Sequence, residues 1–155
     1  MINRGFIQEN EAARVELSEL IARLDERSFN SAVGSGWTIA TSLCHLAFWD
    51  RRVLFLLREW ESSGQIETSR LSSQSIDSIN QAVNAISQAV PGSAAAELAL
   101  DCALAVDSYL RGISDELVGQ LVSGGLERYL RRSLHRREHL QRMKEALDAR
   151  PAGTA

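Results

Sequence analysis

The chain is poor in the residues that interrupt helices and in the patterns that mark strands. It contains only two prolines, Pro91 and Pro151, among its 155 residues. It also lacks runs of β-branched residues that alternate with polar ones, which are the usual signal of a half-buried strand. Apolar residues recur instead at helical spacing along most of the chain. The sequence therefore predicts an all-α fold.

The sequence also lacks the apolar segments that are typical of membrane and secreted proteins. No apolar stretch approaches the roughly 20 residues that a membrane-spanning helix needs. Residues 1–5 lack the apolar region of a signal peptide. We therefore expect a cytoplasmic protein that has no membrane partner. The two cysteines, Cys44 and Cys102, fall within helical patterns, so we expect buried free thiols and no disulfide.

The charge balance argues against nucleic acid as a partner. The formal net charge is −3, which provides no overall field that would attract a polyanion. The arginines near the C-terminus are balanced by acidic residues elsewhere and lack interleaved aromatic residues. At 45% hydrophobic and 24% charged residues, the composition is that of an ordinary globular protein. We expect one domain over residues 1–150 and a disordered tail over 151–155.

The apolar rhythm and the capping signals divide the chain into four long helices and two short ones. The long helices are predicted from about Gln8 or Asn10 to Glu26, from an N-cap at Thr38 to about Ser62, from an N-cap at Ser93 to about Arg111, and from Leu126 to about Ala149. The short helices are predicted over Ile76–Val90 and from Ser114 to Val122, with loops over residues 28–36 and 65–75 and breaks at Pro91-Gly92 and Gly124-Gly125.

The chain's only three histidines, His45, His135 and His139, form the candidate site. Residues four apart on a helix project from the same side, with Cβ atoms roughly 5–6 Å apart. Two such imidazoles and a third from another helix can bind one metal ion and leave a position open for water or substrate. The alternative is that the spacing is accidental, since single histidines are commonly surface residues or hydrogen-bonded core residues.

Helical-wheel positions support this site only in part. His45 lies at the edge of an inward apolar stripe. His135 and His139 project about 100° to the side of the stripe that Leu126, Tyr129, Leu140, Met143 and Leu147 define. They could lie on a solvated flank, or the flank could face a polar cavity between helices, where bundle proteins build their sites.

Neighbouring residues are assigned lesser roles. Asp50 follows His45 by five positions, so it is a poor direct ligand; we expect a surface ion pair, with orientation of an imidazole as the alternative. We expect Trp49 to be a core aromatic, although it could line a pocket. Cys44 should not share the ion of His45. The arginines close to the histidines on the wheel could bind a substrate carboxylate or could simply solvate an exposed face. They are Arg128, Arg131, Arg132 and Arg142.

Two segments resemble the DinB-like superfamily, and most closely its mycothiol-dependent maleylpyruvate isomerases and related thiol transferases. The first is the segment from Gly36 to Asp50, which reads GWTIATSLCHLAFWD. The second runs from Ser133 to Leu140 and reads SLHRREHL. Family members are similar in having a Trp-Thr entry to the second helix, a His-Leu pair within it and a last-helix His-x-x-x-His.

The resemblance implies a four-helix bundle with a long crossover between the second and third main helices. It also implies a divalent metal ion, zinc or nickel, bound by His45, His135 and His139; Glu138 is not expected to be a ligand. The expected function is activation of a low-molecular-weight thiol such as mycothiol or bacillithiol, or of water, for isomerisation, S-transfer or hydrolysis of a small-molecule substrate. A non-catalytic metal-binding stress-response or interaction bundle is the alternative. Homodimerisation is expected only by analogy with the family.

Overall fold

The computed structural model describes residues 3–67 and 71–149, and helices make up most of this part of the chain. The all-α prediction is therefore confirmed. The helices are α1 (Phe6–Ile21), α2 (Glu26–Phe29), α3 (Ile39–Ser63), α4 (Ser73–Ser87), α5 (Gly92–Gly112), α6 (Asp115–Ser123), the 3₁₀ turn η1 (Glu127–Tyr129) and α7 (Arg132–Asp148). None of the helices in the described ranges is long and apolar enough to cross a membrane.

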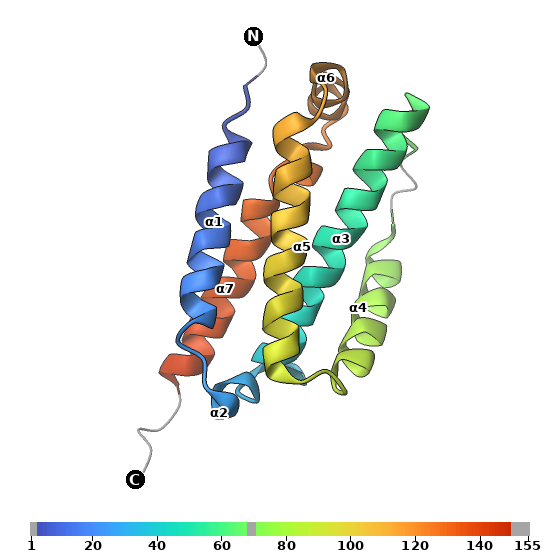
Figure 1. The fold of residues 1–155 in the computed structure, drawn as a ribbon. Helices are drawn as coiled ribbons and strands as arrows, with labels where there is room; N and C mark the ends of the chain where they lie inside the picture. Colours follow the sequence, from blue (N-terminus) through green and yellow to red (C-terminus); the bar gives the residue numbers. More distant parts are fainter. Residues whose placement is uncertain (1–2, 68–70, 150–155) are drawn as a thin grey trace.

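The four longest helices, α1, α3, α5 and α7, lie side by side (Figure 1). Helix α3 packs against α5 and α7, and α1 packs against the same two helices. Following the chain in Figure 1, α3 and α5 point in the same direction, and α4 runs back along α3 between them. The predicted connection between the second and third long helices is therefore present.

Helix α3 begins and ends where its local sequence predicts. The Thr38 hydroxyl accepts a hydrogen bond from the Thr41 amide, and the Thr41 hydroxyl accepts one from the Thr38 amide. This reciprocal capping satisfies two amide groups that no helical carbonyl can reach. At the other end, Gly64 caps the helix with a φ of 69°, a left-handed conformation that glycine adopts without steric cost.

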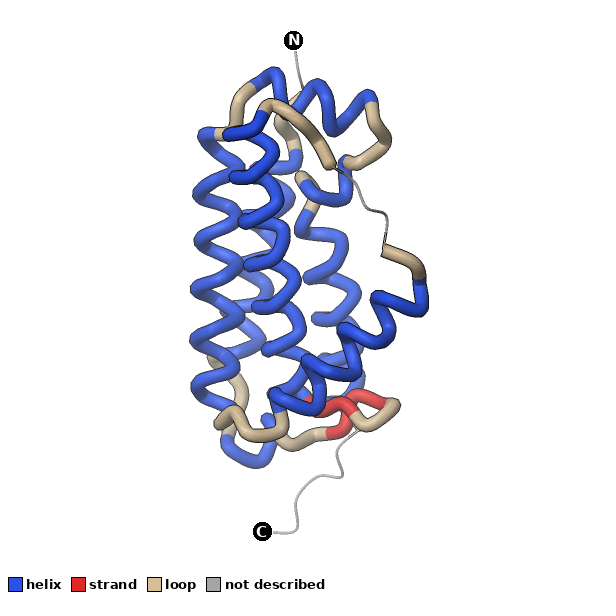
Figure 2. Tube along the Cα trace, turned by 90° about the vertical axis from the view of Figure 1, so that its right-hand side faces the viewer, coloured by secondary structure: helices blue, strands red, loops and turns tan. Residues whose placement is uncertain are grey.

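The prediction was wrong where the first long helix meets the second. Helix α1 ends at Ile21 instead of Glu26, because Asp25 accepts a hydrogen bond from the Ser28 amide and so starts the separate helix α2. The predicted loop over residues 28–36 contains part of α2 and strand β1 (Ala32–Gly34). Strand β1 pairs antiparallel with β2 (Trp37–Thr38) in a small hairpin, drawn in red in Figure 2. Such short strands carry too few residues for an alternating pattern.

The start of the third long helix also differs from the prediction. Pro91, and not Ser93, is the N-cap of α5, so the helix begins at Gly92. A Cβ atom on Gly92 would lie 2.2 Å from Cγ of Phe29. Because Phe29 packs this closely on the first turn of α5, only glycine fits at position 92.

The last helix is shorter than predicted, and this changes which of its faces is defined as the buried one. The stretch from Leu126 is divided into the η1 turn and α7, which begins at Arg132. Leu126 and Tyr129 therefore do not belong to the helix whose buried face they were used to define. The buried residues of α7 are Arg132, Ser133, Arg136, Leu140 and Met143. His139 lies only about 40° around the helix from Met143, so the histidines border the buried face.

The buried interior consists of two apolar clusters with polar residues among them. One cluster includes Phe6, Leu54, Leu57, Trp60 and Leu110. The other includes Leu17, Leu20, Leu43, Leu140 and Met143. Each of the four long helices also contributes a buried polar residue to the interior, namely Asn10, Asp50, Asp107 and Arg136. Cys44 and Cys102 are buried free thiols, as predicted.

Candidate metal centre

The fold brings all three predicted ligands together. His45 lies near the start of α3, and His135 and His139 lie on successive turns of α7. One potential ligand atom from each residue lies within 4.8 Å of the other two. Nε2 of His45 and Nε2 of His135 are 3.1 Å apart. Two nitrogens bound to one tetrahedral metal ion at about 2.0–2.1 Å lie roughly 3.3 Å apart, so the group can hold a metal ion.

Burial keeps the three imidazoles neutral. It lowers the pKa of His45 to about 3, and repulsion from His139, once that ring is protonated, and from Arg132 and Arg142 acts in the same direction. Burial and then Arg142 lower the pKa of His139 to about 4, against an opposing effect of Glu138. The pKa of His135 is also lowered, first by burial and then by Arg132. At neutral pH each ring therefore retains a nitrogen lone pair, the form that binds metals.

Two tryptophans contact His45, one of the three histidines. The β-hairpin positions Trp37, whose ring meets His45 edge-on at 5.3 Å between ring centroids. Trp49 lies one turn after His45 on α3, with its ring centroid 6.2 Å away. The prediction that Trp49 is a core aromatic was wrong. It is only partly buried, lines a cavity and donates from its indole N–H to Oδ1 of Asn80, 3.0 Å away on α4.

The histidines open onto a cavity of about 1140 Å³. Residues of α3, α4, the hairpin, η1 and α7 line it. Because α4 forms part of the wall, the connection between α3 and α5 helps to build the site. The cavity has room for a small molecule beside the histidine cluster.

All four arginines singled out from the sequence line this cavity, as do Arg52 of α3 and Glu138. Three of the four have acidic partners: Arg142 contacts Glu138, Arg131 contacts Glu9, and Arg132 contacts Asp50. The fourth, Arg128, lies over the Tyr129 ring, and Arg52 lies over the Trp49 ring. Within the described residues, neither Arg52 nor Arg128 forms an ion pair with an acidic residue.

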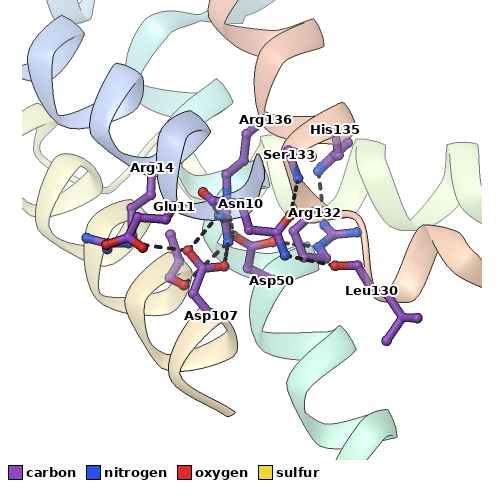
Figure 3. Close-up of polar contacts among 11 residues, drawn as sticks. Asn10, Glu11, Arg14, Asp50, Asp107, Leu130, Arg132, Ser133, His135 and Arg136 are labelled. Atoms are coloured by element: carbon purple, nitrogen blue, oxygen red, sulfur yellow. Dashed lines mark hydrogen bonds and ion pairs between the residues drawn. The ribbon is translucent and has the colours of Figure 1, made fainter. Parts of the chain in front are cut away.

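Asp50 does not form the predicted surface ion pair. Its carboxylate is buried and accepts hydrogen bonds from Nε of Arg132 at 2.8 Å and from Nε of Arg136 at 3.0 Å (Figure 3). Arg136 is fully buried and also donates two hydrogen bonds to the carboxylate of Asp107. A buried charge is tolerated only where opposite charges and hydrogen bonds compensate it. Asp50, Asp107 and Arg136 therefore form a buried ion group, whose second negative charge is compensated by Arg132 on Asp50 and by Arg14 on Asp107.

Asn10 connects the same region to the start of α7. Its side-chain amide donates to the Leu130 carbonyl and accepts from the Ser133 amide, each at 2.8 Å. Its backbone carbonyl accepts from Arg136. The Ser133 amide belongs to the first turn of α7, where helical partners are lacking. Asn10 therefore fixes the first turn of the helix that carries two of the three histidines.

Arg132 joins the buried ion group to the histidine cluster. One of its Nη atoms lies 3.1 Å from Nδ1 of His135 (Figure 3), while its Nε contacts Asp50. Asp50 therefore reaches the cluster indirectly, through a guanidinium. Nδ1 of His45, in contrast, is buried and has no hydrogen-bond partner among the described residues.

The residues that the sequence analysis missed share a recognisable signal. Asn10, Asp107 and Arg136 were not singled out. Asn10 stands four residues after Phe6 and three before Ala13 on the buried face of α1, and Asp107 has the same relation to Ala103 and Leu110 on α5. A polar residue at an apolar position of several helices indicates a shared buried polar layer.

A scan against protein-family models and searches of curated proteins and of solved structures found no match to this chain.

Proposed function

We propose that the chain is a divalent-metal-dependent enzyme whose ion is bound by His45, His135 and His139. The observation that carries the proposal is the convergence of three neutral imidazoles at the wall of a large cavity. Three imidazoles are a common donor set for zinc and nickel. The chain has no other histidine, so every histidine it possesses lies in this group.

The proposed class is a DinB-like four-helix bundle related to mycothiol-dependent isomerases and thiol transferases. The Trp-Thr entry to α3 and the His-x-x-x-His of α7 support this class. So does the order of the helices, since α4 returns the chain between two long helices that point in the same direction. The proposed site is thus made by residues far apart in sequence that this topology brings together.

The proposed chemistry is activation of a thiol or of water. A divalent ion lowers the pKa of a thiol or water that occupies its open position and so supplies a nucleophile at neutral pH. The cosubstrate we propose is a low-molecular-weight thiol such as mycothiol or bacillithiol, and the reaction is isomerisation, S-transfer or hydrolysis of a small molecule.

The chain's own residues would shape the cavity for that reaction. Trp37 and Trp49 both contact His45 and would restrict the access of water to it. Arg52 and Arg128, which have no acidic partner in the described ranges, place positive charge on the cavity wall. Guanidinium groups in such positions bind carboxylates through paired hydrogen bonds.

A second candidate function is a non-catalytic metal-binding bundle. The observation that favours it is that the histidines come from two different long helices, so an ion would cross-link α3 to α7. In that case binding energy becomes folding energy, and removal of the metal would unfold the protein.

Measurements of metal content and of thiol binding distinguish the enzyme from the non-catalytic bundle. The protein should be purified without a histidine tag, and bound zinc, nickel and iron measured in the wild type, in His139→Ala and in the control Arg137→Ala. We expect one metal ion per chain in the wild type and the control, and none in His139→Ala. If the wild type contains no stoichiometric metal even after zinc or nickel is added, the proposed metal centre is wrong.

A cobalt-substituted sample then tests the enzyme. Addition of mycothiol or bacillithiol should change the visible spectrum of the cobalt ion, and the metal-free protein should stay folded by circular dichroism. The non-catalytic bundle would be favoured if the protein unfolds when the metal is removed and if neither thiol changes the cobalt spectrum.

A further inference from the structure

We propose that Arg132 is a positioning residue that competes with the metal ion for His135, so that metal binding moves its guanidinium away from the imidazole. The inference rests on the proposed metal centre and assigns Arg132 a role in controlling its occupancy. Two contacts carry it: that of an Nη of Arg132 with Nδ1 of His135, and that of Nε2 of His135 with Nε2 of His45.

The contact with Arg132 decides which nitrogen of His135 carries the hydrogen. A guanidinium stays charged and can only donate. Its Nη, 3.1 Å from Nδ1 of His135, therefore requires a lone pair on Nδ1. A neutral imidazole has one hydrogen, so that hydrogen must be on Nε2.

The same reasoning extends to His45. The Nε2–H of His135 faces Nε2 of His45 at 3.1 Å, and this nitrogen must accept. The hydrogen of His45 is then on Nδ1, the buried atom that has no partner in the described part of the chain. Arg132, His135 and His45 thus form a directed chain of donors and acceptors. His45 already presents a lone pair toward the cluster, whereas His135 presents a hydrogen.

Metal binding through Nε2 of His135 requires the opposite arrangement. Nε2 must then hold the lone pair, and the ring hydrogen must lie on Nδ1. That hydrogen would face the N–H of Arg132, so two donors would oppose each other. The conflict is removed when the hydrogen moves from Nε2 to Nδ1, with no net gain or loss of a proton, and the guanidinium turns away.

The surroundings permit this movement of Arg132. Its side chain lines the cavity, which offers space beside the histidines. The carboxylate of Asp50 would not be left unpaired, because its second oxygen accepts a hydrogen bond from Nε of Arg136 and forms an ion pair with Nη2 of the same guanidinium. The cost of displacing Arg132 is therefore mainly the loss of its contact with Asp50 and of its contact with His135.

Two measurements test the inference. In zinc-free, ¹⁵N-histidine-labelled wild-type protein, long-range ¹H–¹⁵N correlation spectra should show His135 with its hydrogen on Nε2, and zinc should shift the hydrogen to Nδ1. Zinc affinities should be compared for the wild type, Arg132→Leu and the control Arg142→Leu. Arg142 lowers the pKa of His45 and His139 through its charge, but its hydrogen bond goes to Glu138.

We expect Arg132→Leu to bind zinc about tenfold tighter than the wild type, because the contacts of Arg132 with His135 and Asp50 no longer have to be broken. Arg142→Leu should produce a smaller gain, since it removes only a nearby charge. A hydrogen on Nδ1 of His135 in the zinc-free wild type would overturn the inference. So would zinc binding by Arg132→Leu that is equal to or weaker than that of the wild type, or an equal gain in both variants.

The outcomes remain distinguishable from a failure of the metal centre itself. Zinc titrations that show no binding in the wild type or in either variant would overturn the metal centre and this inference together. Zinc binding without the predicted difference would overturn the inference alone. Should Arg132→Leu fail to fold, the hydrogen position on His135 in the wild type decides the question, because that measurement needs no substitution.

Discussion

The buried ion group and the histidine cluster lie next to each other but differ in how their polar atoms are satisfied. In the ion group, Arg136 donates to Asp50, to Asp107 and to two backbone carbonyls, so its charge is compensated on all sides. In the histidine cluster, three neutral rings direct their nitrogens toward one another and are flanked by cations. In the ion group the charges are already paired, whereas the histidine cluster has nitrogen atoms that could bind a metal ion.

This contrast separates a structural polar layer from a candidate functional site. Buried polar groups in proteins are nearly always hydrogen-bonded, so those that are not require a reason. The ion group ties α3, α5 and α7 together, and Asn10 adds α1. The histidine cluster holds fewer internal hydrogen bonds and faces a cavity. The first is therefore expected to determine stability and the second to determine binding.

Substitution of Arg136 should have the largest effect on stability. In Arg136→Met, the buried carboxylate of Asp107 keeps only its contact with Arg14, and that of Asp50 keeps only its contact with Arg132. Removal of one partner of a buried ion pair costs about 3–5 kcal/mol. The free energy of unfolding, measured in urea, should fall by that amount. Arg137→Met is the matched control, and a similar loss in both variants would contradict the distinction.

The acid dependence of stability is the next largest effect, and it comes from the histidines. The pKa values of His45 and His139 are about 3 and about 4 in the folded protein, and about 6.5 in an unfolded chain. As the pH falls below 6.5, the unfolded chain takes up protons that the folded one does not. The stabilisation is therefore complete above pH 6.5 and declines as the pH falls toward 4.

Between pH 6.5 and 5 each of these two histidines should cost the metal-free protein up to about 1.4 kcal/mol of unfolding free energy per pH unit. Urea unfolding in EDTA at pH 7.5, 6.5 and 5.5 measures this slope. The double variant His45→Gln, His139→Gln should have a much flatter profile. If it keeps the slope of the wild type, other groups cause the acid dependence.

The surface ion pair of Arg137 should have the smallest effect. Arg137 contacts Glu16 at 3.1 Å, and both side chains are substantially exposed. Pairs of this kind contribute between about 0 and 1 kcal/mol. In Arg137→Ala the urea midpoint should therefore change little, and the small change should vanish in 0.5 M salt. A loss of several kcal/mol would show that exposure does not separate these ion pairs as proposed.

Much of the fold could be predicted from the sequence because its signals are local. Thr38 and Ser114 act as N-caps through their own hydroxyl groups, and Gly64 ends α3 in a left-handed conformation. The tight packing of Phe29 on Gly92 could not be predicted in this way, because it depends on contacts between separate elements. The hairpin was missed because its strands have only three and two residues.

The candidate site could be predicted in its ligands but not in its surroundings. The i, i+4 pair of His135 and His139 is a local pattern, and the three histidines do converge. The predicted angle between the two histidines and the buried face of the last helix was wrong. The apolar stripe that defined this face included Leu126 and Tyr129, which precede α7. Burial of Asp50 depends on Arg136, 86 residues away. The position of Asp50, four residues after Leu46 and three before Val53 on α3, indicates burial locally, but the sequence does not identify the partner that compensates its charge.

X-ray absorption of the zinc-loaded, tag-free protein is the most direct test of the central claim. The spectrum reports the atoms bound to the ion, and the account predicts three imidazole nitrogens at about 2.0–2.1 Å with the remaining position filled by a non-protein ligand. In His45→Ala the imidazole signal should fall or the zinc should be lost. Sulfur ligands, or zinc bound by fewer than three imidazoles in the wild type, would contradict the claim.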